Sequence, residues 1–219
     1  RRLAGVATRA SALRLAAPLL AVLAATQLAA PLNPVSPVER NLLVAAIALA
    51  AAAWLGWARA WAAAGARLTL VVQVCWLVAL LAPAMLSETL RPQALGAVVV
   101  PGALPLKAAA ALLALVCLPA LMRLPASGDG GPDEEAAVIR PLLWLPLCGL
   151  FVSLVLPPGA EDLAGIARFI AATLVVAGIT IWLAALTARA PALGRLYPRL
   201  LPSLAAVVLG LAAVTSFLT

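Results

Sequence analysis

The chain has 219 residues, of which 65% are hydrophobic and only 11% are charged, and it carries a net charge of +7 with no histidine. A soluble domain contains about 25% charged residues, so this composition excludes an ordinary soluble globular protein and indicates an integral membrane protein. The apolar runs lack the alternation of a membrane β-barrel, and helices satisfy their own backbone in lipid. We therefore predict one all-α domain, a polytopic bundle of about seven transmembrane helices.

The predicted spans follow from runs of apolar residues, since a span needs about 20 of them. The spans are expected at residues 15–30, 41–64, 68–86, 106–121, 141–156, 163–187 and 200–218. Residues 65–67 read as a tight turn, and residues 188–199 as a basic loop. Residues 87–105 are too broken by proline and glycine to form a span, so we expect a loop with a partly buried or re-entrant piece at 94–100.

Residues 122–140 form the only long polar interruption of the apolar sequence, and they hold four of its eight acidic residues. A cluster of carboxylates can be catalytic, but a solvated loop is the more common explanation, and we expect that. The interruption is the first place to look for contact with a soluble partner. The candidate partner-docking residues are Arg123, Asp129, Asp133, Glu134, Glu135 and Arg140.

The distribution of basic residues predicts an orientation, because loops on the cytoplasmic side carry an excess of Lys and Arg. With a cytoplasmic amino terminus, eleven arginines fall on the cytoplasmic side and four basic residues on the other. The eleven are Arg1, Arg2, Arg9, Arg14, Arg59, Arg67, Arg123, Arg140, Arg189, Arg195 and Arg199. The four are Arg40, Arg91, Lys107 and Arg168. We therefore expect a protein of the cytoplasmic (inner) membrane with the polar loop 122–140 in the cytoplasm.

The predicted span interiors contain no Asp, Glu or His, and Lys107 and Arg168 lie near span ends, where long side chains reach the membrane surface. The three cysteines, at positions 75, 117 and 148, lie in separate spans without a metal-binding spacing. We therefore predict no catalytic residue, no metal ligand and no cofactor site in this chain. Ion transport by the chain alone is not expected, because proton and ion paths normally use intramembrane ionisable groups.

Alanine is abundant in the spans, most densely at residues 45–53 and 108–111. Small residues let helix backbones approach closely, so these helices are suited to packing against one another or against helices of a larger assembly. Trp54, Trp57 and Trp61 share one face near the end of the second span and are typical of an interfacial aromatic belt.

Three stretches of the chain carry a resemblance to a known family. They are residues 7–31, residues 122–135, where Arg123–Leu124–Pro125 precedes an acidic stretch, and residues 188–219. They resemble the second span, the cytoplasmic loop, and the basic segment with the last span of a membrane subunit shared by respiratory complex I and the membrane-bound group 4 hydrogenases. In complex I this is the quinone-site membrane subunit, and in the hydrogenases it is the formate hydrogenlyase subunit 4 type. The buried glutamates of the family's middle spans have no counterpart here, and neither does its first span within the sequence given. The chain thus resembles a degenerate member of that family.

The resemblance implies a non-catalytic subunit of a multi-subunit, ion-translocating or electron-transfer complex, such as an oxidoreductase complex. Its cytoplasmic loops would anchor a peripheral redox arm, and its helices would pack against antiporter-like subunits. The expected partners are therefore other membrane subunits, the redox arm and lipid, with no nucleic acid. Two alternatives stay open: a small polytopic transporter or permease, and a structural subunit of another membrane assembly. A permease should purify alone and move a solute, whereas a complex subunit should co-purify with large partners.

Overall fold

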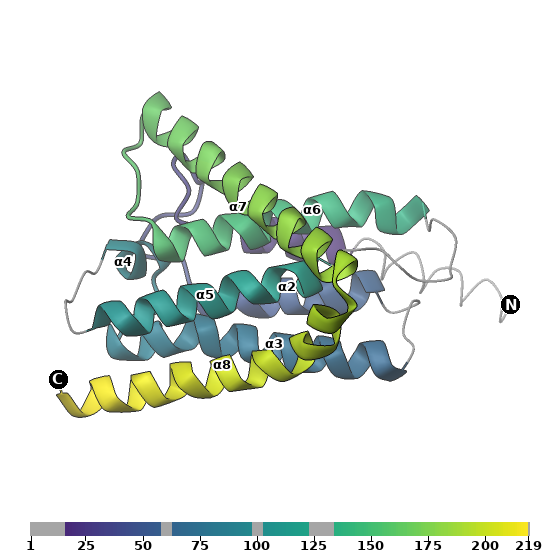
Figure 1. Ribbon diagram of the computed structural model, residues 1–219. Helices are drawn as coiled ribbons and strands as arrows, with labels where there is room; N and C mark the ends of the chain where they lie inside the picture. Colours follow the sequence, from purple (N-terminus) through teal and green to yellow (C-terminus); the bar gives the residue numbers. More distant parts are fainter. Residues whose placement is uncertain (1–15, 58–62, 98–102, 123–133, 219) are drawn as a thin grey trace, which may run out of the picture.

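The computed structural model describes residues 16–57, 63–97, 103–122 and 134–218, and every regular element within these ranges is helical (Figure 1). The helices are Ala16–Ala25, α2 (Leu42–Trp57), α3 (Ala63–Leu86), α4 (Pro92–Ala97), α5 (Leu104–Leu121), α6 (Glu134–Val155), α7 (Leu163–Arg189) and α8 (Pro191–Leu218). The predicted all-α class is therefore confirmed for the described part of the chain.

Four helical segments among the described residues are long and apolar enough to cross a membrane. They are Arg67–Leu86, Leu104–Leu121, Leu163–Arg189 and Leu196–Phe217. Three shorter apolar segments accompany them, at Ala16–Ala25, Leu42–Leu55 and Leu142–Val155. Each of the seven overlaps one of the spans expected from the sequence. Together they identify a membrane-embedded helical protein with four clear candidate spans.

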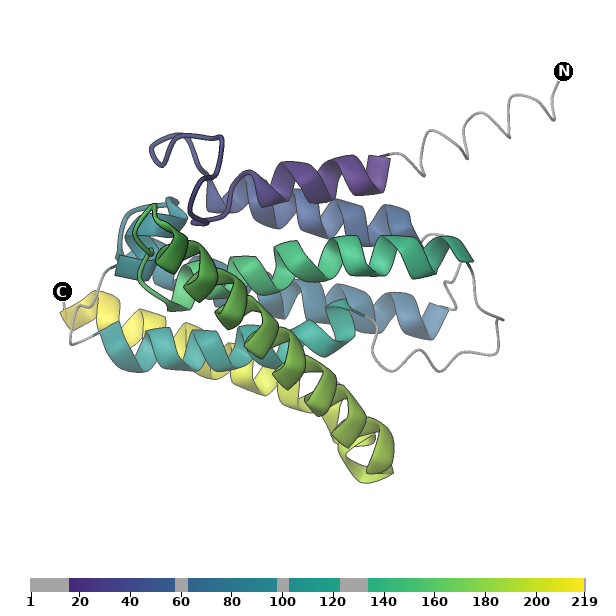
Figure 2. The same cartoon turned by 90° about the horizontal axis from the view of Figure 1, so that it is seen from above.

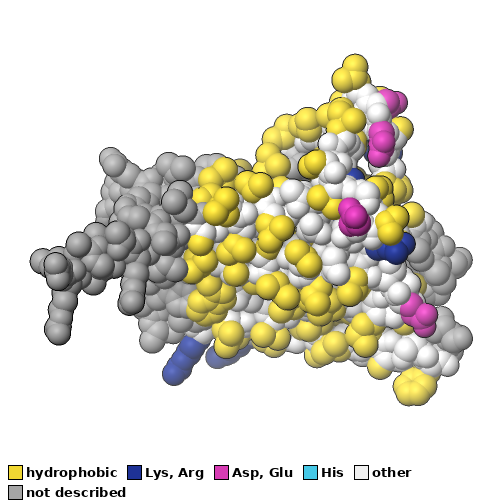
Figure 3. Space-filling view, turned by 180° about the vertical axis from the view of Figure 1, so that it is seen from behind, with side chains coloured by type: hydrophobic (Ala, Val, Ile, Leu, Met, Phe, Trp, Pro, Cys, Tyr) yellow, Lys and Arg dark blue, Asp and Glu magenta, His cyan; other side chains and the backbone are white. Residues whose placement is uncertain are grey.

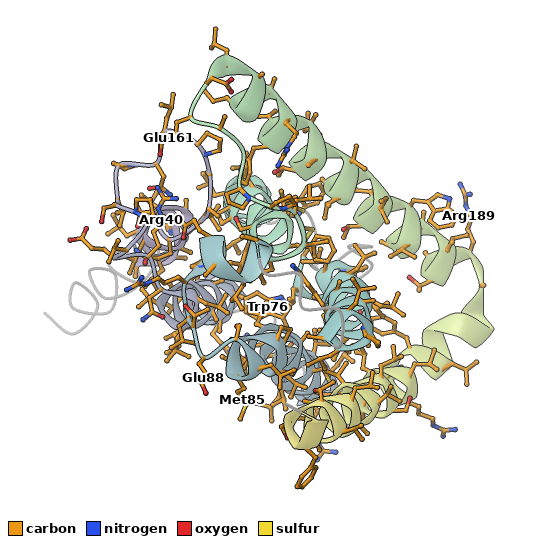
Figure 4. The ribbon with its side chains drawn as sticks, turned by 90° about the vertical axis from the view of Figure 1, so that its left-hand side faces the viewer. Arg40, Trp76, Met85, Glu88, Glu161 and Arg189 are labelled. Carbon is orange, nitrogen blue, oxygen red and sulfur yellow. The ribbon has the colours of Figure 1, made fainter. Side chains whose placement is uncertain are left out.

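Successive long helices along the chain run in opposite directions and lie side by side, except that α7 crosses the others obliquely (Figures 1 and 2). The central contacts join α3, α5 and α8 to one another, and α6 contacts α2, α4, α5 and α7. Helix α5 touches both α3 and α6, so it lies at the middle of the bundle. Trp76 of α3 is 2% exposed and points into this interior (Figure 4).

Alanine fills much of the packed interior. In α2, buried alanines recur along almost the whole helix, at Ala45, Ala46, Ala48, Ala52 and Ala53. Side chains this small allow neighbouring backbones to approach, and α2, which contacts α6, buries these alanines together with Leu42 and Leu49. The abundance of alanine in the sequence therefore reflects close helix packing within the chain itself.

The molecule has two ends along the helix axes. We call one the α4 end; it consists of residues 26–41, the carboxyl end of α3, α4, the amino end of α5, residues 156–162 and the carboxyl end of α8. The other, the opposite end, holds the amino ends of α3 and α6 and the junction of α7 with α8. In Figure 3 the middle of the visible face is apolar, and the acidic side chains in view lie toward the α4 end.

Three boundaries between helices and loops differ from those predicted from the sequence. Residues 65–67 do not form a turn, because α3 begins at Ala63 and continues through them. The expected basic loop 188–199 is almost entirely helical, since α7 ends at Arg189 and α8 begins at Pro191. The expected polar loop 122–140 ends earlier than predicted, because α6 begins at Glu134 rather than at residue 141. In residues 87–105 the structure places the short helix α4, which overlaps the piece expected at 94–100.

Candidate functional site

The candidate docking residues fall into two groups. Arg123, Asp129 and Asp133 lie outside the described residues. Glu134, Glu135 and Arg140 belong to the first two turns of α6, so they are helical rather than part of a loop. Helix α6 thus extends for about two turns on the amino-terminal side of its apolar segment Leu142–Val155. Two of the acidic residues therefore stand at a helix amino terminus, where negative charge is stabilised.

A buried arginine organises the α4 end. Arg40 is only 5% exposed, and its Nε donates to the Val35 carbonyl oxygen at 2.8 Å. The Gln93 amide, with its oxygen turned toward the guanidinium, accepts from Nε at 3.1 Å. Burial lowers the pKa of Arg40, and the Glu161 carboxylate acts in the opposite direction. Figure 4 shows Arg40 and Glu161 on neighbouring loops at this end. The arginine therefore holds residues 26–41 against α4, so its role is structural.

Two further polar contacts fasten the same connection, residues 26–41. The Gln27 side-chain oxygen accepts from the Asn41 main-chain N–H at 2.8 Å. The Ser153 hydroxyl, on α6, accepts from the Ala29 N–H at 3.0 Å and donates to the Gly149 carbonyl at 2.8 Å. A buried main-chain N–H without a partner is costly, so Ser153 satisfies a group that would otherwise be stranded at the entry to this connection.

Most polar side chains inside the described spans are satisfied locally, although the buried Trp144 indole N–H on α6 has no hydrogen-bond partner. The Trp54 indole N–H donates to the Gln73 side-chain oxygen, which ties α2 to α3. The buried hydroxyls Thr173, Thr180 and Thr215 each donate to the carbonyl four residues earlier in their own helix. These contacts join each group to its nearest backbone or neighbouring helix. Within the described residues they do not form a chain of polar groups from one end of the molecule to the other.

Lys107 occupies the first turn of α5, at the α4 end. Its Nζ donates to the carbonyl oxygens of Leu95 at 2.9 Å and Gly96 at 3.2 Å, which belong to the last turn of α4. Gly96 is required there, because a Cβ at this position would lie 2.5 Å from the Leu156 carbonyl oxygen. From the sequence we expected Lys107 to extend toward the membrane surface. Instead it reaches across to α4 and holds that helix between α5 and α6.

Two adjoining recesses flank Lys107. The first lies among α3, α4, α5 and α6, and the second lies between the ends of α3 and α5; Pro83, Leu95 and Lys107 line both. Alanines form much of the floor of the first recess, at Ala79, Ala110, Ala111 and Ala114. Among the described residues that line the recesses, Lys107 is the only charged one. The sequence signal for this site was a lysine inside an alanine-rich span beside a proline- and glycine-broken segment.

The outward faces of α7 and α8 are broad and apolar. Only 22% of the apolar stretch of each of these helices is buried inside the molecule, against 44% for α3 and α5. Leu174 is 66% exposed and Trp182 61% on α7, and Val214 is 57% exposed on α8. Gly178 and Gly210 also face outward, since a Cβ added at either would meet no atom within 4 Å. These faces are covered by lipid or by another protein in the membrane.

The described residues offer little for metal or covalent chemistry. Cys75, Cys117 and Cys148 are free and buried. No group of three or more His, Cys, Asp or Glu side chains comes together within residues 16–57, 63–97, 103–122 and 134–218. The described residues instead offer two surfaces for binding: the recesses beside Lys107 at the α4 end, and the apolar faces of α7 and α8.

Comparison with known proteins does not extend these observations, because no family model, curated protein or solved structure matches the chain.

Proposed function

We propose that the chain is a non-catalytic membrane subunit of a multi-subunit, ion-translocating or electron-transfer complex, of the kind that its sequence resembles. In this role its helices pack against neighbouring membrane subunits, and the polar segment between α5 and α6 anchors a peripheral arm. The observation that carries the proposal is the large outward apolar surface of α7 and α8 with glycine at its centre.

That surface has the character of a helix-packing site. In lipid, helices associate where small residues let backbones approach closely. On α8, Ser203, Ala206, Gly210 and Ala213 are exposed and recur every three or four residues, so they line one side of the helix. Gly178 lies outward on α7. Large exposed residues such as Trp182 flank these small positions and would cover the sides of a docked helix.

We further propose that all seven apolar segments cross the membrane, with the opposite end in the cytoplasm. The apolar segment of α6, Leu142–Val155, covers about 21 Å at 1.5 Å per residue, and the charged first turns of the helix lengthen it to about 33 Å. In this arrangement the apolar segment lies in a hydrocarbon layer of about 30 Å, and the charged turns reach the membrane surface. The opposite end carries Arg67, Arg140, Arg189, Arg195 and Arg199, and the α4 end carries Arg40, Arg91, Lys107 and Arg168. With the arginines at positions 1, 2, 9, 14, 59 and 123 counted from the sequence, the expected ratio is eleven to four, the bias that the positive-inside rule associates with a cytoplasmic opposite end.

The internal hydrogen bonding favours a scaffold over a permease. A transporter needs groups that can exchange partners with a passing solute or ion. In the described spans, Gln73 is held between α2 and α3, and the buried threonines bond to their own helices. Such groups stabilise one packing of the bundle and leave little polar surface for a moving solute.

The test is the size of the assembly in native membranes. The chain, tagged and expressed in its source cells, should run in mild detergent as part of a particle much larger than its own 22.2 kDa. Gly210→Trp should release it from that particle, because the new indole would separate the facing helices. Ile47→Trp is the matched control, since Ile47 is 58% exposed on α2, away from this surface. A monomeric wild-type chain that moves a solute in liposomes would contradict the proposal and favour a permease.

A further inference from the structure

The connection between the helix Ala16–Ala25 and α2, residues 26–41, turns large apolar side chains outward and polar ones inward. Leu32 and Val38 are 68% and 66% exposed, whereas the side chains of Asn33 and Arg40 bond to the backbone of the connection. A loop in water has the reverse arrangement, with its polar side chains outward. We propose that this connection lies against the lipid of the membrane, with Leu32 and Val38 in the layer where acyl chains meet headgroups.

The backbone of the connection is satisfied from within, as contact with lipid requires. Asn33 serves three main-chain groups. Its Nδ2 donates to the carbonyl oxygens of Ala25 at 3.2 Å and Leu28 at 3.0 Å, and its Oδ1 accepts from the Val35 N–H at 3.2 Å. The Val35 carbonyl in turn accepts from Arg40. These groups therefore do not need water as a hydrogen-bonding partner.

The composition of the connection further reduces its need for water. Pro31, Pro34 and Pro37 have no main-chain N–H, so three donors that would need partners are missing. No charged residue lies between Gln27 and Glu39. Irregular backbone with few free donors and no charge is suited to a segment that lies at the edge of the hydrocarbon layer.

The backbone at Leu32 holds its side chain outward against a conformational preference. Leu32 has a φ of 55°, in the left-handed region that a bulky residue rarely adopts. In water, an unfavourable backbone conformation that exposes a leucine would have no compensation. Against acyl chains, the same side chain removes apolar surface from water. The conformation of Leu32 therefore also favours lipid as the occupant of this surface.

The position of the connection places it beside the membrane rather than above it. In Figures 1 and 2 the amino end of α5 and the carboxyl end of α8 extend further along the helix axes than the connection does. A membrane that accommodates α5 and α8 therefore surrounds the connection as well. Glu39, which is exposed at its end, needs water, so the surface layer is the depth that suits both the carboxylate and the apolar side chains. This holds whichever end of the molecule is cytoplasmic.

The experiment measures the depth of spin labels on the purified full chain in phosphatidylcholine vesicles by electron paramagnetic resonance. Oxygen concentrates in lipid and a nickel chelate stays in water, so the ratio of their collision rates with a label reports depth. The labelled variants are Leu32→Cys and Val38→Cys, with Glu88→Cys and Glu161→Cys as controls at exposed charged positions of the same end. The native cysteines are buried, and the wild-type chain treated with the same reagent gives the background. The oxygen-to-nickel ratio should be several-fold higher at positions 32 and 38 than at the controls.

A second pair of variants tests the inward polar bonds. Asn33→Leu leaves the Ala25 and Leu28 carbonyls without this partner, so the connection should open toward water and the ratio at position 32 should fall to the control value. Ser36→Ala, which changes an exposed side chain of the same connection, should leave the ratio unchanged. An unchanged ratio in Asn33→Leu would overturn the role given to Asn33.

Ratios at positions 32 and 38 that equal those of the controls in an otherwise wild-type chain would overturn the proposal, because the connection would then lie in water. Such ratios in vesicles, together with immobilised labels in native membranes, would overturn it in favour of a protein partner that covers the connection.

Discussion

Gly96 brings the backbone of α4 close to Ser153 and Leu156, and replacing it with alanine gives a sharp test of that packing. A Cβ at position 96 would lie 2.5 Å from the Leu156 carbonyl oxygen and 2.9 Å from that of Ser153. Carbon–oxygen contacts normally begin near about 3.3 Å, so α4 would have to move away from α6 by several tenths of an ångström. Both obstacles are main-chain atoms, which cannot rotate aside.

The expected change in stability on Gly96→Ala follows from two opposing effects. Alanine is favoured over glycine inside a helix by about 1 kcal/mol. Overpacking a filled site costs about 1–3 kcal/mol, and displacing α4 also strains the bonds from Lys107, each with a net value of about 0.5–1.5 kcal/mol. Gly96→Ala should therefore destabilise the protein by about 1–3 kcal/mol overall. For a domain of this size, 1 kcal/mol lowers the Tm by about 2–4 °C.

The assay is thermal unfolding in detergent, followed by far-ultraviolet circular dichroism, with Gly210→Ala as the matched control. A Cβ at position 210 meets no atom within 4 Å, so only the helix-propensity gain remains and the Tm should stay equal or rise slightly. Opposite shifts in the two variants are the expected result. If Gly96→Ala unfolds at the same temperature as Gly210→Ala, the close contact between α4 and α6 does not exist as described.

Three other experiments test separate parts of the fold. Tyr197→Phe removes a 2.6 Å hydrogen bond from α8 to a carbonyl of α5 and should cost about 0.6 kcal/mol, the average for such bonds within membranes, as a small drop in Tm. Asp162→Ala removes the side-chain cap of α7, a 2.6 Å bond, and should cost about 1 kcal/mol; an unchanged Tm would argue against that cap. Cysteines placed at Glu88 and at Arg189, which are exposed at opposite ends, should react with an impermeant reagent from opposite sides of the membrane.

The sequence predicted where apolar helices lie, but it misplaced several of their ends for a physical reason. Hydropathy marks the part of a helix that suits lipid, whereas the helix continues as long as its backbone can hydrogen-bond. Glu134 and Arg140 interrupt the apolar pattern without interrupting α6. The expected basic loop 188–199 is helical for a similar reason. Pro191 is compatible with the first turn of α8, where the missing N–H removes no hydrogen bond of the helix.

The candidate site was less predictable, because it depends on contacts between segments far apart in the sequence. Lys107 is recognisable in the sequence as a charge near the start of a span. Its reach to the carbonyls of α4 depends on α4 folding back between α5 and α6, and that depends on Gly96. Hydropathy does not encode such a tertiary contact. Likewise, the alanine run after Lys107 predicts close packing, but only the structure shows that part of it lines the first recess.

Gly96 and Lys107 also stabilise the same contact, so their substitutions should not act independently. The carbonyl of Gly96 accepts from Lys107, and its Cα sits against α6, so moving α4 moves the acceptor that holds the ammonium. Gly96→Ala and Lys107→Gln should therefore lower the Tm by less in the double variant than the sum of the two single changes, because the first already weakens the bonds that the second removes. Thermal unfolding of the two single variants and the double variant in the same detergent measures this difference. If the two shifts in Tm add fully, then the position of α4 and the bonds from Lys107 are independent.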